Sequence, residues 1–226
     1  MKYFTLLVSL LLAVTACQEA PKKEATPETA PAAKRDLLDS LAAAHGFDRW
    51  KEVREIRFTF NVDRDTSHYE RSWIWEPKAN RVTRIQNGDT LTYLRSQVDS
   101  TLTAADGGFI NDKYWFLAPY QWVWDRNSFT HTFTRQVPAP ISGEPMDKLT
   151  IVYGQEGGYT PGDAYDFFIG KDSLVAEWVF RRGNQAEPSV VTTWEQYQMP
   201  MGLKLASVHQ NAEGNFKLYF TGIEVR

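Results

Sequence analysis

Two short segments of the chain are rich in tryptophan and phenylalanine, the residue types best suited to holding an apolar ligand. A pocket for such a ligand needs a concave apolar wall that side chains leave partly unfilled. The candidate ligand-binding residues are Trp73, Trp75, Trp115, Phe116, Trp122 and Trp124. Core packing is the competing interpretation, because the eight tryptophans of the chain all need burial.

A pair of carboxylates offers an alternative chemistry, hydrolysis by a general acid and base. Asp163 and Asp166 flank Tyr165, just after Pro161 and Gly162. Glycoside hydrolysis would require the two carboxyl groups to converge at about 5 to 10 Å in a cleft. An Asp after Pro-Gly is also a common turn residue that accepts hydrogen bonds from local amides. The chain has no Gly-x-Ser-x-Gly motif and no phosphate-binding glycine loop, so its sequence favours a non-enzymatic protein.

The histidines do not form a metal-binding pattern. They are separated along the chain, with no His-x-His or His-x-x-x-His pair, and a single cysteine cannot supply a thiolate cluster. The four histidines are His45, His68, His131 and His209. The sequence therefore predicts no metal and no cofactor.

The single cysteine, Cys17, follows an apolar leader. Lys2, the apolar residues 4–14 and the small residues before Cys17 have the order of a secretory signal. The apolar run is shorter than the about 20 residues that a membrane-spanning helix needs. Val14-Thr15-Ala16-Cys17 resembles the bacterial lipobox, in which cleavage precedes the cysteine and the cysteine receives lipid. Residues 1–16 are then a signal peptide; an ordinary signal peptide with an incidental thiol is the alternative.

A polar segment separates Cys17 from the rest of the chain. Residues 17–35 are rich in Pro, Ala, Glu and Lys and contain no large apolar side chain, which is typical of a disordered tether. Eighteen extended residues reach roughly 60 Å. Gln18, in place of an Asp, resembles the signal that sends bacterial lipoproteins to the outer membrane. We expect a cell-envelope protein held on that membrane by lipid, with the leaflet that it faces left open.

Composition restricts the partners of the remaining chain. The 226 residues carry a net charge of -3 without any block of basic residues, so nucleic acid is not an expected partner. No second cysteine is present to form a disulfide within the chain. Residues 36–226 are long enough for one domain, which we expect to be monomeric and stabilised by its aromatic residues.

The pattern of apolar residues predicts a mainly β, α+β domain. Residues 36–46 have a helical pattern with Asp36 as a cap and Gly46 at the end, and residues 111–118 predict a short central helix before Pro119. Two Pro- and Gly-rich loops lie at 137–145 and 154–162. Alternation with period two predicts antiparallel strands at residues 55–62, 68–75, 81–86, 90–95, 129–135, 148–153, 165–169, 174–181, 190–197, 204–210 and 216–220.

This arrangement resembles the superfamily of LolA/LolB-like lipoprotein carriers and receptors. It resembles more closely a family of bacterial lipoproteins of unknown function, through His45-Gly-Phe-Asp-Arg-Trp50, Lys113-Tyr-Trp-Phe-Leu-Ala-Pro-Tyr120 and Thr160-Pro-Gly-Asp163. The resemblance implies one strongly curved antiparallel sheet, an unclosed barrel that covers a helical lid. The soluble carrier has no lipid anchor, so the lipobox favours a tethered lipid-binding or receptor role.

The sequence thus predicts a membrane-anchored lipoprotein that binds a lipid, an acyl chain or another lipoprotein in the concave face of the sheet. The alternative is a surface module that binds glycan or protein through exposed aromatic side chains. Trp122 and Trp124 distinguish the two hypotheses. Burial in a cavity favours lipid, and display in a flat row favours glycan.

Overall fold

The computed structural model describes residues 35–226. The predicted signal peptide, Cys17 and all but the last residue of the predicted tether lie outside the described residues. No helix in the described part of the chain is both long enough and apolar enough to cross a bilayer.

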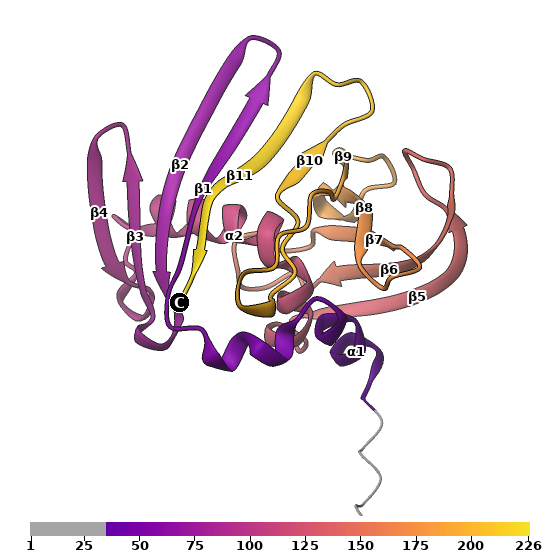
Figure 1. Cartoon of the computed structure of the whole chain (residues 1–226), viewed down its shortest axis with the longest axis horizontal. Helices are drawn as coiled ribbons and strands as arrows, with labels where there is room; N and C mark the ends of the chain where they lie inside the picture. Colours follow the sequence, from indigo (N-terminus) through magenta and orange to yellow (C-terminus); the bar gives the residue numbers. More distant parts are fainter. Residues whose placement is uncertain (1–34) are drawn as a thin grey trace, which may run out of the picture. The chain divides into compact units, whose positions relative to one another are not determined.

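Residues 35–226 form an α+β unit with two antiparallel sheets (Figure 1). The six-stranded large sheet, in the order β10-β11-β1-β2-β3-β4, consists of β1 (Ile56–Arg64), β2 (Ser67–Glu76), β3 (Arg81–Gln86), β4 (Asp89–Leu94), β10 (Val208–Gln210) and β11 (Phe216–Val225). The five-stranded small sheet has its strands in chain order, namely β5 (Phe129–Pro138), β6 (Pro145–Tyr153), β7 (Ala164–Ile169), β8 (Val175–Arg181) and β9 (Val190–Thr193).

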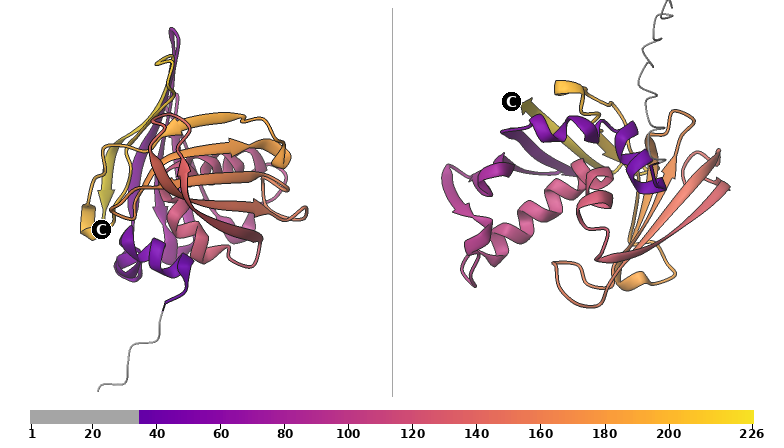
Figure 2. Two further views of the ribbon diagram at one scale, coloured as in Figure 1. Left: turned by 90° about the vertical axis from the view of Figure 1, so that its right-hand side faces the viewer. Right: turned by 90° about the horizontal axis from the view of Figure 1, so that it is seen from below.

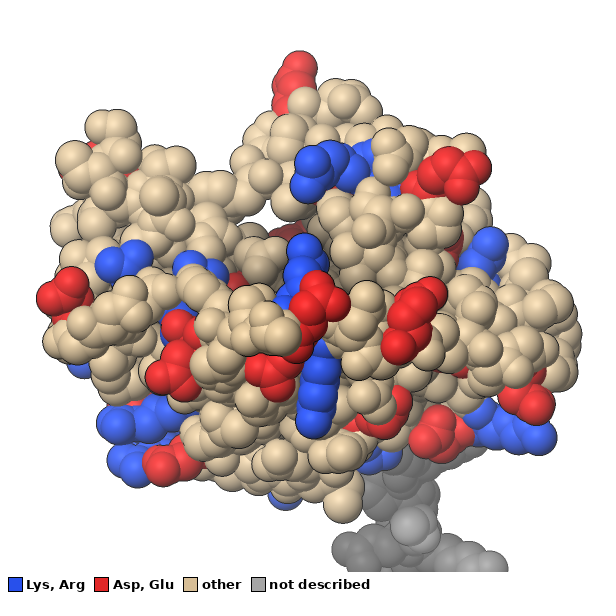
Figure 3. Space-filling view, turned by 90° about the horizontal axis from the view of Figure 1, so that it is seen from above, with Lys and Arg blue, Asp and Glu red and all other residues tan. Residues whose placement is uncertain are grey.

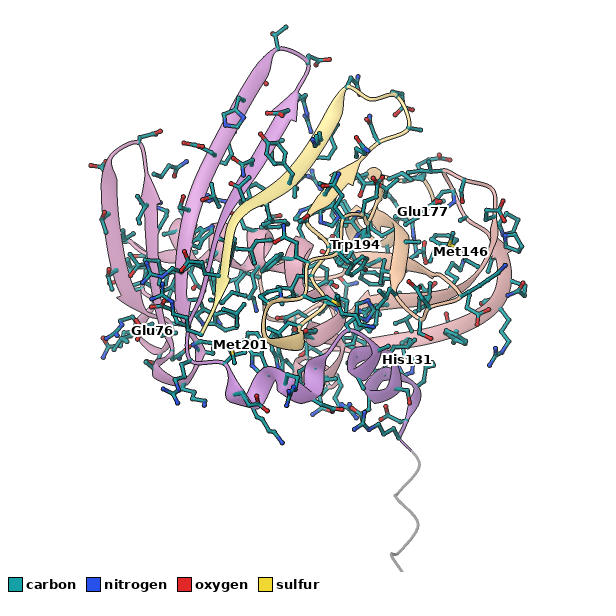
Figure 4. The ribbon with its side chains drawn as sticks, viewed as in Figure 1. Glu76, His131, Met146, Glu177, Trp194 and Met201 are labelled. Carbon is teal, nitrogen blue, oxygen red and sulfur yellow. The ribbon has the colours of Figure 1, made fainter. Side chains whose placement is uncertain are left out.

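The expectation of one continuous sheet is wrong, because the chain leaves the strand conformation between β9 and β10. The backbone bridges here, Glu195–Val208 and Gln198–Leu205, are isolated, and Thr193 of β9 contacts His209 and Gln210 of β10 through side-chain hydrogen bonds and not through a ladder. Pro200 has no N–H to donate to a ladder, and Met201 and Gly202 have φ angles of 50° and 80°. Met201 lies in this turn, close to the 3₁₀ helix Phe47–Glu52 (Figure 4). The predicted strands at 190–197 and 204–210 are shortened accordingly.

The N-terminal helix α1 (Leu37–Ala44) has the predicted ends. The Asp36 side chain accepts a hydrogen bond from the backbone N–H of Asp39 at 2.8 Å, and Gly46 adopts a left-handed conformation with φ 90°. The 3₁₀ helix Phe47–Glu52 follows directly. Its Trp50 ring packs 5.3 Å from Trp75 of β2, which ties this end of the chain to the large sheet.

The central helix α2 (Thr103–Trp124) is much longer than the predicted 111–118. Pro119 does not end it; instead the helix bends at Leu117, whose φ and ψ are -125° and 21°. Proline removes one helical hydrogen bond and its ring crowds the preceding turn, which produces a kink. The turn beyond the kink is held by packing, since Trp122 is fully buried and the Tyr120 hydroxyl donates to the carbonyl oxygen of His45 at 2.8 Å.

Helix α2 lies in the angle between the two diverging sheets (Figure 2). Towards the large sheet, the Phe116 ring packs 5.1 Å from Phe58 of β1 and 4.5 Å from Phe220 of β11. Asp112 of α2 accepts hydrogen bonds from the Arg71 guanidinium at 2.8 Å and from the Trp73 indole N–H at 2.7 Å. The hollow of the large sheet is therefore filled by aromatic side chains and by this buried ion pair.

One face of the molecule shows how its surface charges are distributed. On the face shown in Figure 3, basic and acidic side chains are interspersed among uncharged residues. The described residues include several surface ion pairs of this mixed kind, such as Arg81 with Glu76 and Arg35 with Asp48.

Gly46 gives a test of how tightly the N-terminal segment is packed. A Cβ atom there would lie 2.2 Å from the carbonyl oxygen of Gly202, whereas Gly88, at a similar φ of 82°, has nothing within 4 Å. We expect Gly88→Ala to lower the free energy of unfolding by about 1 kcal/mol, the cost of the left-handed conformation. Gly46→Ala should lower it by about 3 kcal/mol or more because of the added clash. Equal losses for the two variants in urea unfolding would contradict this packing.

Candidate functional site

Two adjoining cavities lie along α2 beside the loop formed by residues 154–162, here called the glycine loop. The first extends to the 3₁₀ helix Phe47–Glu52 and to β2, and the second lies against the small sheet. The first, the lysine cavity, has a volume of about 550 Å³ and is lined by Lys113 of α2 together with Trp50, Trp75 and Trp124. The second, the apolar cavity, has a volume of about 390 Å³. Its lining includes Ile110, Trp115, Tyr165, Trp178, Phe180 and Val190.

The two cavities share a wall that comes from α2 and the glycine loop. Ile110 and Tyr114 of the helix and Tyr159 and Thr160 of the loop line both cavities. Ile110, Lys113 and Tyr114 are spaced three and four residues apart, which places them on one face of the helix. Phe116 packs on β1 and β11 and lines neither cavity, whereas this face borders the open space and meets the large sheet only where Lys113 lies over Trp75 of β2.

The glycine loop is attached to α2 through Tyr159. The Tyr159 hydroxyl donates to Asp106 at 2.8 Å, and Gly107 allows the ring to lie against the helix, since a Cβ there would be 3.3 Å from the ring. Gly157 and Gly158 have φ angles of 76° and 68°. Both are in open space, so the loop covers the shared wall with little packing of its own.

Asp106 is the fixed point to which the loop is attached. It is buried and accepts hydrogen bonds from the Tyr93 hydroxyl at 3.1 Å and from Arg95 at 2.9 Å, in addition to Tyr159. Burial acts to raise the pKa of Asp106, but the hydrogen bonds from Arg95 and Tyr159 outweigh it and hold the pKa below its ordinary value. Asp106 therefore already accepts hydrogen bonds from three protein side chains.

Lys113 is the unusual residue of the site. It is 4% exposed, and its Nζ atom lies 5.3 Å from the Trp75 ring centroid and 5.2 Å from that of Trp124. Its one hydrogen-bond partner is Gln121, whose Oε1 atom accepts at 2.5 Å. No carboxylate among residues 35–226 forms an ion pair with it.

The environment of Lys113 favours the neutral amine. Burial lowers its pKa from 10.5 to about 7, and the positive charge of Arg95 acts in the same direction. A buried ammonium group is costly unless it is paired, and aromatic faces replace only part of its hydration. At neutral pH the amine is therefore close to its midpoint of protonation.

A series of side-chain hydrogen bonds continues from Lys113 across the kink of α2. Gln121 accepts from Lys113, and its Nε2 atom donates to Asp125 at the end of the helix. Eight residues of straight helix rise about 12 Å, so these side chains bridge the bend at Leu117. These hydrogen bonds fix the direction of the Lys113 amine, and Asp125 at their end lies on the wall of the lysine cavity.

The structure distributes the six sequence-predicted residues between cavity and core. Trp75 and Trp124 line the lysine cavity, and Trp115 lines the apolar cavity. The other three lie in the packed core. Trp73 donates to Asp112, Phe116 packs on Phe58 and Phe220, and Trp122 packs 5.0 Å from Phe167.

The two aspartates considered for hydrolysis both have structural partners. Asp163 accepts a hydrogen bond from the backbone N–H of Gly183 at 2.7 Å. Asp166, on β7, accepts from Thr150 at 2.5 Å and from the Arg181 guanidinium at 3.0 Å. These contacts connect β7 with β6 and with the end of β8. The geometry does not favour the hydrolase hypothesis.

The described residues contain no group of three His, Cys, Asp or Glu side chains placed to hold a metal ion. Two of the histidines are instead part of the core, and burial lowers the pKa of His45 to about 4 and that of His209 to about 3. His45 Nε2 accepts from the backbone N–H of Val175 at 3.2 Å, so this ring fixes α1 against β8.

Sequence reasoning missed most of the cavity wall. The unrecognised lining residues include Trp50, Lys113, Tyr114, Tyr153, Tyr159 and Trp178. The available signal was Lys113 itself, because a lone lysine with Phe109 and Phe116 at helical spacing on either side falls on a buried face. Tyr159 carried no comparable signal, since its place depends on the loop fold.

No protein-family model matches the chain, and no curated protein matches its sequence. The solved structures that are similar include a DUF1329 family protein from Desulfovibrio piger, with 11% identity, a TM-score of 0.45 and coverage of 84% of this chain and 94% of that one. A LolA superfamily protein from Nitrosomonas europaea has 9% identity, a TM-score of 0.47 and coverage of 85% and 94%. A structure described as an outer membrane lipoprotein-sorting protein domain, from Vibrio parahaemolyticus, has 8% identity, a TM-score of 0.43 and coverage of 84% and 93%.

These likenesses are too distant to carry a function to this chain. The family defined by the His-Gly-x-x-x-Trp pattern stays a prediction.

The depressed pKa of Lys113 predicts a specific dependence of stability on pH. Between about pH 7 and 10.5 the unfolded chain keeps the lysine proton that the folded chain has lost, so raising the pH favours folding. From pH 7 to 9, the free energy of unfolding should therefore rise by up to about 1.4 kcal/mol per pH unit more than in Lys113→Met.

Lys51→Met, which removes an exposed lysine, serves as the matched control and should keep the wild-type rise. Parallel curves for the wild type and Lys113→Met in denaturant titrations would show that Lys113 has an ordinary pKa.

Proposed function

We propose that the domain binds an acyl chain or another lipid in the two adjoining cavities and that lipid on Cys17 holds the protein at the outer membrane. The observation that carries this proposal is the pair of cavities that share the wall of Ile110, Tyr114, Tyr159 and Thr160. One end of the space is lined by aromatic and aliphatic side chains, and the other contains Lys113.

The size and lining of the cavities suit a slender apolar ligand. Small-molecule sites usually have volumes of about 300 to 1,000 Å³ and a mostly apolar wall with a few polar groups. Each buried methylene contributes about 0.8 kcal/mol, whereas association costs at least about 4 kcal/mol. A chain of about ten methylenes exceeds that minimum cost once more than about five of them are buried.

The positions of Trp122 and Trp124 do not fit a flat platform for a glycan. Trp122 is fully buried, and Trp124 is half-buried with its ring on the wall of the lysine cavity. Neither tryptophan is displayed on a flat surface, as a sugar-stacking platform would require. The exposed large apolar side chains, among them Tyr69, Ile85 and Met199, come from separate elements.

The glycine loop provides a route into the cavities. Its attachment to α2 through the Tyr159–Asp106 hydrogen bond can open without loss of core packing, because Gly157 and Gly158 contact nothing within 4 Å of an added Cβ. Loops with few packed contacts open at low free-energy cost. The ligand enters when this loop moves and is covered when Tyr159 binds Asp106 again.

The anchor keeps the binding site close to the membrane. In this proposal the lipid on Cys17 and the tether of residues 17–35 keep a monomeric domain near the membrane that supplies the ligand, which raises the effective concentration of that ligand. Another acylated lipoprotein is a second possible source of the same acyl chain. Retention or transfer of the chain beside the membrane follows from this placement.

Binding of linear alcohols of increasing length tests the proposal. In the full chain with Cys17→Ser, which cannot be acylated at that residue, each two added methylenes from octan-1-ol to dodecan-1-ol should tighten binding up to about 15-fold. Ile110→Trp fills the shared wall and should weaken dodecan-1-ol binding at least about tenfold. Ile85→Trp, at a surface position that is 40% exposed, should leave it unchanged.

Calorimetry or quenching of tryptophan fluorescence measures these affinities. Affinity that does not depend on chain length, or equal affinity in Ile110→Trp and the wild type, would contradict binding in the cavities. Saturable binding of a neutral oligosaccharide with no binding of the alcohols would support the glycan hypothesis instead.

A further inference from the structure

The Lys113 amine has unused hydrogen-bonding capacity at a cavity wall. An ammonium group has three N–H donors, and the described residues supply one acceptor, the Oε1 atom of Gln121. The remaining contacts are the aromatic faces of Trp75, Trp124 and Phe109, at 5.3, 5.2 and 5.9 Å. Aromatic faces attract a cation but accept hydrogen bonds poorly.

The nearby charged side chains do not supply further hydrogen-bond acceptors to the Lys113 amine. Arg95 is already bound to Asp106, and Asp125 receives the Gln121 amide. Glu156 also lines the lysine cavity but forms no ion pair with Lys113. Buried charges in proteins are normally paired. Because the buried Lys113 amine faces a cavity and can donate further hydrogen bonds, we expect the ligand to supply an acceptor.

The charge balance of the lysine cavity restricts what that acceptor can be. The lining carries Arg95 and Lys113 against Asp125 and Glu156. A group with one negative charge can pair with the Lys113 amine, whereas the second charge of a phosphate monoester would have no free cation beside it, since Arg95 is bound to Asp106. A carboxylate therefore fits this position better than a phosphate monoester.

The remainder of the ligand has one direction in which to extend. Beyond Ile110 and Tyr114 the space continues into the apolar cavity, whose wall includes Trp115 and Trp178. That cavity is lined by no acidic or basic side chain. It suits an alkyl chain attached to the carboxylate.

We infer that the site selects amphiphilic monocarboxylic acids, with Lys113 donating to the carboxylate in the lysine cavity and the alkyl chain lying in the apolar cavity. This inference rests on the proposed function, because it names the class of lipid that the same cavities take. Lys113 is thereby the residue that determines specificity, and Ile110 and Tyr114 separate the polar end of the site from the apolar end.

The test compares decanoic acid with decan-1-ol, two ligands of equal chain length that differ in the terminal group. In the full chain carrying Cys17→Ser, decanoate should bind about tenfold or more tightly than the alcohol at pH 7, the usual gain from charge-assisted hydrogen bonds. Lys113→Met should bring this ratio close to one by weakening the acid much more than the alcohol, because methionine keeps the volume of the side chain but carries no charge. Lys51→Met should retain the ratio of the wild type.

The outcomes separate this inference from the proposed function. Equal binding of acid and alcohol in the wild type overturns selection by Lys113 and leaves the cavity as a site for neutral lipid. Failure of both ligands to bind overturns the proposed function as well. Preference for decyl phosphate over decanoate also overturns the inference. The ratio of the affinities for decanoate and decan-1-ol in the wild type tests the inference even if a variant folds poorly.

Discussion

Helix α2 has to be buried on nearly every side while it carries a lysine on one of its apolar faces. The large sheet satisfies one side of the helix through Phe116, the Arg71–Asp112 ion pair and the neighbouring aromatic rings. Next to these contacts Lys113 has only Gln121 and aromatic faces, among them that of Trp75 of the same sheet. Close packing there would leave a charge wholly unsolvated, and the structure leaves the lysine cavity instead. The lysine cavity is therefore a consequence of how this helix is placed.

The bend at Leu117 makes that placement possible. A straight helix ending at Pro119 would not have carried Gln121, Trp124 and Asp125 to the cavity wall. Because the helix continues through the proline, its last turn packs against His45 and the 3₁₀ helix, and its polar groups reach back to Lys113. The small sheet then covers the same helix from the opposite direction. The glycine loop, which joins β6 to β7, covers the remaining opening through Tyr159. Glu177 of β8, labelled in Figure 4, holds the loop after β5 by accepting from the N–H groups of Ile141 and Ser142 at 2.7 and 3.0 Å.

Local patterns in the sequence predicted the elements of this fold better than their assembly. The alternation of apolar residues located all the strands, and Asp36 and Gly46 marked the ends of α1. The break between the two sheets was missed because Pro200, Met201 and Gly202 interrupt two runs that otherwise alternate correctly. The length of α2 was missed because packing around Tyr120 and Trp122 outweighs the local effect of Pro119. Among the aromatic residues, composition indicated a binding role for the group but could not separate Trp75, on the cavity wall, from Trp73, in the core. That distinction depends on which side of α2 remains open, and no local signal carries it.

The most direct test of the whole account is a crystal structure of the chain with a fatty acid that carries bromine at the end of its alkyl chain. The account predicts an anomalous bromine peak in the apolar cavity, beside the wall formed by Trp115, Trp178 and Phe180, with the carboxylate within hydrogen-bonding distance of Lys113 Nζ. A bromine peak outside both cavities, or cavities closed by their own side chains in the presence of saturating ligand, would contradict it.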